Sequence, residues 1–286
     1  MISNTNDSHQ LSRNKASGYL LVCAAASFSP AAIANGNALS VPAGYKLVWS
    51  DEFNVDGQPD PAKWNFDTAN NKRGWDNHEL QYYSGPEATN ARVKGGRLFI
   101  TAKKESRSSA ADWGGQRYTS ARLTTQGKAL WTYGFFEVRA KMPCGKGTWP
   151  AIWMLGTTGD WPAQGELDIL EHVGSDPTRV FSTVHMSAGH GGNGVGGASR
   201  NIDACGKFHS YQMHWNADGM RFGLDGFAHL KYPNLKLGSR AWPFDAPQFM
   251  LLNLAIGGDL GGEVDDRIFP RAMEVDHVRV YQPDGK

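Results

Sequence analysis

The sequence predicts an all-β fold of two stacked antiparallel sheets, a sandwich or a jelly roll. Past residue 44, short runs rich in Val, Ile, Phe, Tyr, Trp and Thr are broken by Gly, Pro, Asn and Asp at intervals typical of antiparallel strands and their turns. Long helical periodicity is almost absent, and no internal repeat, linker or second domain is visible. We therefore expect a single domain over residues 35–286.

The N-terminal segment, residues 1–34, differs from this pattern. Arg13 and Lys15 precede an apolar run over residues 19–26, and Ala32-Ile33-Ala34 has the small-x-small form of a leader cleavage site. The apolar run is shorter than the roughly 20 residues that span a bilayer, which disfavours a membrane anchor. The segment is therefore predicted to be a signal peptide cleaved after Ala34, and the protein to be secreted or periplasmic.

The clearest strand is expected between Tyr133 and Met142, where apolar and charged side chains alternate. One face carries Phe136, Val138, Ala140 and Met142, and the other carries Glu137, Arg139 and Lys141. Such alternation suits a sheet with one buried and one wet face. The other expected strands cover, in chain order, residues 46–53, 97–103, 118–125, 149–155, 166–171, 180–186, 210–216, 249–256 and 274–282. Asp218-Gly219 and Asp225-Gly226 are expected at hairpin turns.

The balance of charges narrows the classes of partner that we expect. The chain has 29 Lys and Arg against 28 Asp and Glu, which gives neither the basic footprint of a nucleic-acid-binding protein nor an acidic tail. We expect a neutral partner, with no nucleic acid, no membrane and a monomeric chain.

Beyond the leader, Cys144 and Cys205 remain, an even count that permits a disulfide in an oxidising compartment.

Residues 166–171, Glu-Leu-Asp-Ile-Leu-Glu, place three carboxyl groups within six residues. Because side chains alternate along a strand, Glu166 and Asp168 share a face, whereas Glu171 falls on the opposite face. A single β-bulge near Ile169-Leu170 would absorb the extra residue and return Glu171 to the carboxylate face. We therefore expect all three acids on one surface.

Three like charges on one surface repel one another, which raises the pKa of at least one acid. Glycoside hydrolysis needs such a split, with one ionised and one protonated carboxyl group across the scissile bond. With the bulge, Glu166 and Glu171 are expected at the roughly 5 to 5.5 Å separation of retaining enzymes, which form a covalent glycosyl-enzyme intermediate. A solvated acidic edge and a divalent-cation site are the alternatives for these residues.

Aromatic residues gather near the acids. Trp149 and Trp153 come on the segment before them, and Trp161 lies five residues ahead of Glu166. Flat rings can stack on the apolar faces of sugars, although each ring taken alone is more often a core residue than a platform. We expect at least one of the three to be a sugar platform. The glycine-rich stretch 189–197 lacks the ending of a phosphate loop and is expected to be a surface loop.

These residues resemble glycoside hydrolase family 16, whose signature Glu-x-Asp-x-x-Glu is present as Glu166, Asp168 and Glu171. The resemblance extends over nearly all of the chain beyond the leader. Its further motifs are WSDEF at 49–53, GWDNHELQYY at 74–83, GTWPAIWM at 147–154, LNLAIGG at 252–258 and VRVY at 278–281. They resemble the laminarinase-like branch, which implies endo-β-1,3-glucanase activity, a concanavalin-like jelly roll with a concave cleft, and no cofactor for catalysis.

The resemblance also implies roles for individual residues. Glu166 would be the nucleophile, Glu171 the general acid/base, and Asp168 the carboxylate that tunes and orients the nucleophile. Without the resemblance, the sequence does not show which of the two glutamates is the nucleophile and which is the acid/base. Trp149 and Trp153 would line the donor subsites. Further cleft contacts are expected from Trp75, Arg122, Trp161, His185 and Asn253. A salt bridge is the alternative for Arg122, and a buried strand histidine for His185.

Some members of the family carry a structural calcium ion. The resemblance places its ligands here at Glu52 and Asp276, with the Gly95-Gly96 turn, so that Glu52, Gly96 and Asp276 are the expected metal residues. Calcium takes six to eight oxygen ligands. His277 stands where an aromatic residue is expected after the aspartate.

Other substrates fit the same motifs. Mixed-linkage β-1,3-1,4-glucan and a galactan such as agarose are the alternatives within the family. A non-catalytic β-glucan recognition protein of the same fold is the alternative outside enzymes, and retention of Glu166, Asp168 and Glu171 disfavours it.

Overall fold

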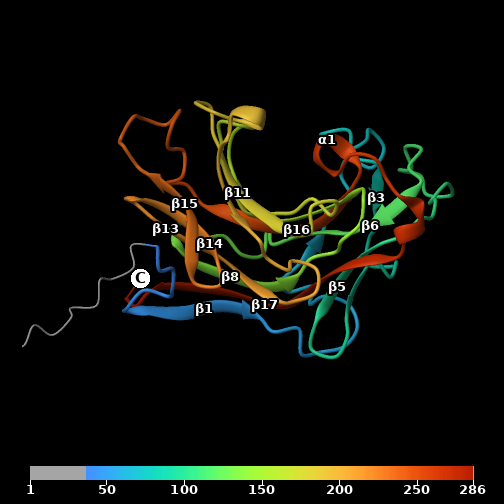
Figure 1. Cartoon of the computed structure of the whole chain (residues 1–286), viewed down its shortest axis with the longest axis horizontal. Helices are drawn as coiled ribbons and strands as arrows, with labels where there is room; N and C mark the ends of the chain where they lie inside the picture. Colours follow the sequence, from blue (N-terminus) through green and yellow to red (C-terminus); the bar gives the residue numbers. More distant parts are fainter. Residues whose placement is uncertain (1–36, 286) are drawn as a thin grey trace, which may run out of the picture. The chain divides into compact units, whose positions relative to one another are not determined.

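The computed structural model describes residues 37–285, and it confirms the all-β prediction. In this part of the chain, two antiparallel sheets are stacked on one another (Figure 1). The predicted signal peptide, residues 1–34, lies outside the described residues.

The first sheet has eight strands in the described part of the chain, in the order β15-β14-β13-β8-β17-β5-β4, with β1 beside β17. Their bounds are β1 Tyr45–Asp51, β4 Ala91–Val93, β5 Leu98–Ala102, β8 Gly134–Lys141, β13 His209–Asn216, β14 Gly219–Leu224, β15 Phe227–Pro233 and β17 Arg271–Pro283.

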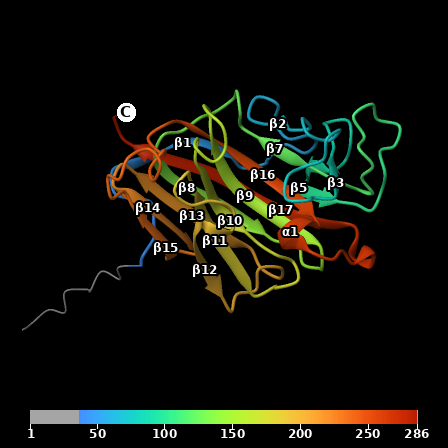
Figure 2. The same ribbon diagram turned by 90° about the horizontal axis from the view of Figure 1, so that it is seen from above.

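The second sheet has seven strands among the described residues, in the order β12-β11-β10-β9-β16-β7-β2. Figure 2 shows β12, β11, β10 and β9 side by side. The bounds are β2 Asn65–Phe66, β7 Arg122–Thr124, β9 Thr148–Gly156, β10 Glu166–Glu171, β11 Arg179–His185, β12 Val195–Arg200 and β16 Gln248–Ile256. Outside the two sheets, β3 Gln81–Tyr83 and β6 Tyr118–Ser120 form a parallel pair, α1 spans Gly258–Gly261, and single 3-10 turns span Gly191–Asn193 and Asp266–Ile268.

The core lies between the two sheets. Strand β8 alternates as predicted: Phe136, Val138 and Ala140 are fully buried, while Glu137 and Arg139 are partly exposed. Burial of a large apolar side chain contributes about 1.5–3 kcal/mol each, so this one face anchors the first sheet to the second. Ring pairs extend the core through Trp49, Trp64, Trp131, Phe136 and Trp215.

The hairpin prediction at Asp225-Gly226 is confirmed between β14 and β15. Asp225 has φ 47° and Gly226 has φ 85°, and a two-residue turn whose backbone matches the strand twist needs positive φ at both positions. The turn between β13 and β14 falls at residues 217–218, so that Gly219 already begins β14.

Two sequence predictions were wrong in detail. The single strand expected over residues 118–125 is two strands, because β6 pairs with β3 whereas β7 pairs with β16 in the second sheet. The glycine-rich stretch 189–197 is not loop throughout, since β12 begins at Val195 and pairs with β11. Glycines leave no apolar alternation to mark such a strand in the sequence.

Cys144 and Cys205 form a disulfide with a Cα–Cα distance of 5.7 Å, which confirms the pairing that the even count permitted. It joins the loop between β8 and β9 to the loop between β12 and β13. No helix within residues 37–285 has the length and apolar character needed to cross a membrane.

Candidate active site

The predicted bulge is present in strand β10. On the β9 side, Asp168 pairs with Trp153 and the next pair is Leu170 with Ile152, so that Ile169 has no partner in the register. The register with β11 shifts between Asp168 and Glu171 as well. The extra residue changes the parity of the strand, and Glu166, Asp168 and Glu171 all border one cleft with a volume of about 1150 Å³.

All of the substrate contacts expected from the sequence border the same cleft: Trp75, Arg122, Trp149, Trp153, Trp161, His185 and Asn253. The glycine-rich stretch contributes Gly191, Gly192, Gly194, Gly196 and Gly197 to its rim. The structure therefore brings together residues that lie between positions 75 and 253 of the chain, as the prediction requires.

Glu171 lies at the end of β10 and is 9% exposed. The indole Nε1 of Trp149 donates a 3.0 Å hydrogen bond to Glu171 Oε1, and Thr183 Oγ1 lies 3.5 Å from Oε2. Burial raises the pKa of Glu171 to about 7, while the hydrogen bond from Trp149 lowers it. A carboxyl group of this kind can hold and release a proton near neutral pH, as a general acid/base must.

Glu166 lies at the start of β10 and is partly exposed to the cleft. The indole Nε1 of Trp161 donates a 2.6 Å hydrogen bond to Glu166 Oε2. Burial first, and then the charge of Asp168, raises the pKa of Glu166 to about 8, while His185 lowers it.

Asp168 lies between the two glutamates and is 3% exposed. Its Oδ2 is 3.0 Å from His185 Nε2, and its carboxyl group is hydrogen-bonded to Glu166. Burial raises the pKa of Asp168 well above its usual range. The hydrogen bond between the two carboxyl groups raises the pKa of Glu166 and lowers that of Asp168, and it orients the Glu166 carboxyl group toward Asp168.

The N–H groups that donate hydrogen bonds to these acids argue against the alternative of a divalent-cation site. Single ligand atoms of Glu166, Asp168 and His185 lie within 4.8 Å of one another, close enough to hold a metal ion. However, the indole N–H groups of Trp161 and Trp149 point at the two glutamates and would repel a cation there. Buried N–H donors suit carboxylates that act on a neutral substrate.

The floor of the cleft holds Arg122 between two aromatic rings. Its guanidinium carbon lies 4.8 Å from the ring centroids of both Trp75 and Trp153, and its Nε lies 2.9 Å from Asp67 Oδ2. Trp153 Nε1 donates a 2.7 Å hydrogen bond to Asn253 Oδ1. The salt bridge considered for Arg122 is therefore present, and Arg122 borders the cleft as well.

Trp161 is the most exposed of the three tryptophans expected as sugar platforms, at 47%. Its ring meets His190 edge to face at a centroid distance of 5.2 Å. Trp149 is 8% exposed and Trp153 is partly exposed. Sequence reasoning assigned these rings a stacking role and missed that two of them also donate hydrogen bonds to the acids.

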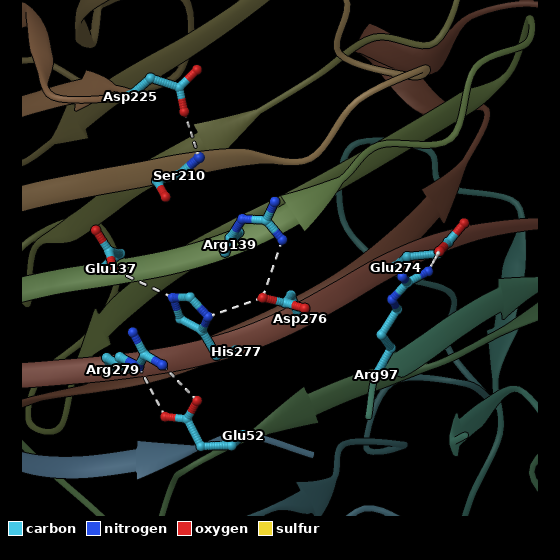
Figure 3. Close-up of polar contacts among 10 residues, drawn as sticks. All are labelled: Glu52, Arg97, Glu137, Arg139, Ser210, Asp225, Glu274, Asp276, His277 and Arg279. Atoms are coloured by element: carbon cyan, nitrogen blue, oxygen red, sulfur yellow. Dashed lines mark hydrogen bonds and ion pairs between the residues drawn. The ribbon is translucent and has the colours of Figure 1, made fainter. Parts of the chain in front are cut away.

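Of the three residues expected to bind calcium, Asp276 lies on β17 and Glu52 follows the neighbouring β1 (Figure 3), while Gly96 lies in the turn between β4 and β5. Both oxygens of Glu52 accept hydrogen bonds from Arg279, at 2.9 and 2.8 Å. Asp276 Oδ2 lies 3.1 Å from both Arg139 Nη1 and His277 Nδ1. Cations of the chain already neutralise both carboxylates, so these residues do not fit a calcium site in this arrangement. The calcium site stays a prediction, and no step below uses it.

Comparison with known proteins places the chain among related sequences and structures. A model described as glycosyl hydrolases family 16 matches residues 62–267. The beta-glucanase of Rhodothermus marinus is 46% identical over 252 residues, 83% of this chain and 85% of that protein. The glucan endo-1,3-beta-glucosidase of Cryptopygus antarcticus is 39% identical over 242 residues, 77% of this chain and 84% of that protein.

The fold agrees with solved structures as well. The crystal structure of SCLam, a non-specific endo-beta-1,3(4)-glucanase of the same family, is similar with a TM-score of 0.84 and 49% sequence identity, covering 86% of this chain and 94% of that chain. This similarity confirms the jelly-roll fold of two stacked sheets.

Proposed function

The chain belongs to glycosyl hydrolase family 16, and on this premise we propose that it is a retaining hydrolase that cleaves β-1,3-glucan at internal bonds. The observation that supports this most directly is the bulged strand β10, which presents Glu166, Asp168 and Glu171 to one cleft. The neutral balance of charges fits an uncharged polysaccharide.

In the first step, Glu166 attacks the anomeric carbon of the sugar bound in the cleft. Glu171 gives its proton to the glycosidic oxygen as the bond from that oxygen to the anomeric carbon breaks, and a glycosyl ester forms on Glu166. Asp168 aligns the nucleophile through the hydrogen bond between their carboxyl groups. Trp161 donates to the other side of the same carboxylate.

In the second step, Glu171 is ionised and takes a proton from a water molecule. The water oxygen bonds to the anomeric carbon, and the ester bond to Glu166 breaks. Two inversions at one carbon leave its configuration retained. The hydrogen bond from Trp149 stabilises the ionised form of Glu171 that this step requires.

The proposal is tested with laminarin as substrate. We expect new reducing ends from random internal cuts, with the β-anomer as the first product observed by NMR. Glu166→Gln and Glu171→Gln should each lower kcat by several orders of magnitude. An α-anomer as first product, or full activity in either variant, would exclude the mechanism.

Azide distinguishes the two glutamates. With Glu166→Ala, azide replaces the nucleophile and should give a glycosyl azide of inverted configuration, whereas with Glu171→Ala it replaces water and should give a retained one. The opposite pattern would exchange the two roles.

Mixed-linkage β-1,3-1,4-glucan is the second candidate substrate. The similarity to SCLam, a non-specific endo-beta-1,3(4)-glucanase, favours it. Barley glucan assayed beside laminarin tests this breadth. Hydrolysis of agarose alone would instead support the galactan alternative, and binding of laminarin without hydrolysis would support a recognition protein.

We also propose that the protein is exported and acts as a monomer. The Cys144–Cys205 disulfide supports folding in an oxidising compartment. N-terminal sequencing of the exported protein should begin at Asn35, and its mass in solution should be that of one chain.

A further inference from the structure

A third glutamate borders the cleft, and the mechanism above gives it no role. Glu79 precedes strand β3 and forms an isolated bridge with Gly257, at the end of β16. In the pairing of β16 with β9, Gly257 lies past the residue that pairs with Trp149. In the pairing of β9 with β10, Trp149 lies past the residue that pairs with Glu171. Glu79 therefore lies past the Glu171 end of the catalytic strand.

Trp149 connects Glu79 to the acid/base. A methyl group placed on Gly258 would lie 3.3 Å from the Trp149 ring and 3.4 Å from Glu79 Cγ. The glycine thus lets the backbone approach both side chains closely. The same Trp149 donates to Glu171, and Glu79 and Glu171 border the same cleft.

The carboxyl group of Glu79 is held by one of its oxygens. Gln81 Nε2 donates to Oε2 at 2.6 Å, and the Tyr83 hydroxyl lies 3.4 Å from the same atom. Both donors are fixed in turn, since Gln81 Oε1 accepts from Ile256 N and Tyr83 Oη accepts from Asn253 Nδ2. Such a group loses little conformational freedom when it binds a ligand.

The other oxygen is free to bind a ligand. Among the described residues Oε1 of Glu79 has no hydrogen-bond partner, and it is not one of the buried unpaired atoms. Glu79 borders the cleft, so solvent and substrate reach this oxygen from there.

Burial raises the pKa of Glu79, which favours a protonated carboxyl group toward neutral pH. Arg122 and the hydrogen bonds from Gln81 and Tyr83 lower the pKa, and Asp76 raises it. On the α1 side, Asp259 is paired with His78. Because Oε2 accepts from two donors, Oε1 is the oxygen that is left to bind a hydroxyl group.

We propose that Glu79 is a substrate-binding residue whose Oε1 hydrogen-bonds a hydroxyl of the sugar unit lying past Glu171. The inference rests on the proposed function. A carboxyl oxygen accepts a hydrogen bond from a sugar hydroxyl when the group is ionised, and it can also donate one when the group is protonated. Glu79 acts on binding and takes no part in bond breaking.

The test is the dissociation constant of a β-1,3-linked glucose hexasaccharide, measured by calorimetry on the Glu166→Gln variant so that no turnover occurs. Adding Glu79→Leu should weaken binding about tenfold, the loss of roughly one hydrogen bond. Adding Glu79→Gln, which keeps a donor and an acceptor, should weaken it less. The matched control is Glu87→Gln, an exposed glutamate paired with Arg107.

The pH dependence separates binding from a structural role. The pH profile of the affinity between pH 5.5 and 8.5 should differ between the chain that keeps Glu79 and the chain with Glu79→Gln, because a glutamine at the contact with the sugar cannot titrate. Glu171 titrates in the same window in every variant, so the difference between variants reports Glu79.

Three results would overturn the inference. If affinity is unchanged with Glu79→Leu, or the pH profile is unchanged with Glu79→Gln, the role of Glu79 in binding is refuted. The proposed function still stands in that case, provided that the unaltered chain hydrolyses laminarin. No hydrolysis of laminarin and no binding of the hexasaccharide would overturn the proposed function together with it.

Discussion

At the scale of single residues, the indole N–H groups of Trp149 and Trp161 distinguish this site from a simple row of acids. Each donates to one glutamate, at 3.0 and 2.6 Å. Hydrogen bonds to a charged carboxylate contribute about 1.5–3 kcal/mol, enough to change the ionisation of the group they contact. The face of each ring can therefore stack on a sugar while the ring nitrogen donates a hydrogen bond to a glutamate.

We expect Trp149→Phe to lower kcat about tenfold or more and to extend activity to higher pH. The lost hydrogen bond stabilised ionised Glu171, so its pKa rises from about 7. Glu171 must be protonated for the first step, and a higher pKa keeps it protonated at higher pH. The measurement is kcat/KM on laminarin between pH 4 and 10.

Trp161→Phe is the matched control, since it removes the donor from Glu166 instead. The pKa of Glu166 rises, and the acid limb of the same profile moves to higher pH because the nucleophile must be ionised. Identical profiles for the two variants would contradict separate roles for the indoles.

At the scale of elements, the bulge in β10 sets which way the acids face. Ile169 is the residue without a partner, and its side chain is buried. Removing it would leave Glu-Leu-Asp-Leu-Glu, in which regular alternation again places all three acids on one face.

We expect deletion of Ile169 to give a folded protein with reduced but measurable activity. The carboxyl groups stay in the cleft at altered spacing, while loss of a buried isoleucine side chain costs about 2–5 kcal/mol. Thermal unfolding and kcat/KM on laminarin check this expectation. A folded deletion variant as inactive as Glu166→Gln would contradict the parity argument.

At the scale of the whole molecule, the first sheet neutralises its own outer charges. Figure 3 shows Glu52 with Arg279, Asp276 with Arg139 and His277, and Glu274 with Arg97. Exposed ion pairs contribute about 0–1 kcal/mol each, so this network adds little to stability. Its larger effect is on whether these carboxylates can bind a cation. Carboxylates engaged by arginine are poor ligands for a cation.

We expect calcium removal to leave the protein unchanged. A cation that does not bind the folded state adds no stability, so Tm in a chelator should equal Tm in millimolar calcium chloride. Magnesium chloride at the same ionic strength controls for screening. A rise of several degrees with calcium alone would show that the ion displaces Arg279 from Glu52, and would restore the expected site.

Much of the site could be predicted because its evidence is local in the chain. The six residues from Glu166 to Glu171 contain both the carboxyl groups and the parity conflict that requires a bulge. The alternation of β8 likewise predicts its buried face. Strand β12 could not be found in this way, since Gly196 and Gly197 carry no side chains to alternate.

The sequence by itself determined the fold class, the strand that carries the acids and the residues that gather around them, because strand period and parity are properties of neighbouring residues. Only the tertiary structure decided which partners these residues meet. Trp149 reaches Glu171 across 22 positions, Asn253 reaches Tyr83 across 170, and Arg279 reaches Glu52 across 227. Hydrogen bonding, burial and pKa depend on such contacts, and they exist only once the sheets have stacked.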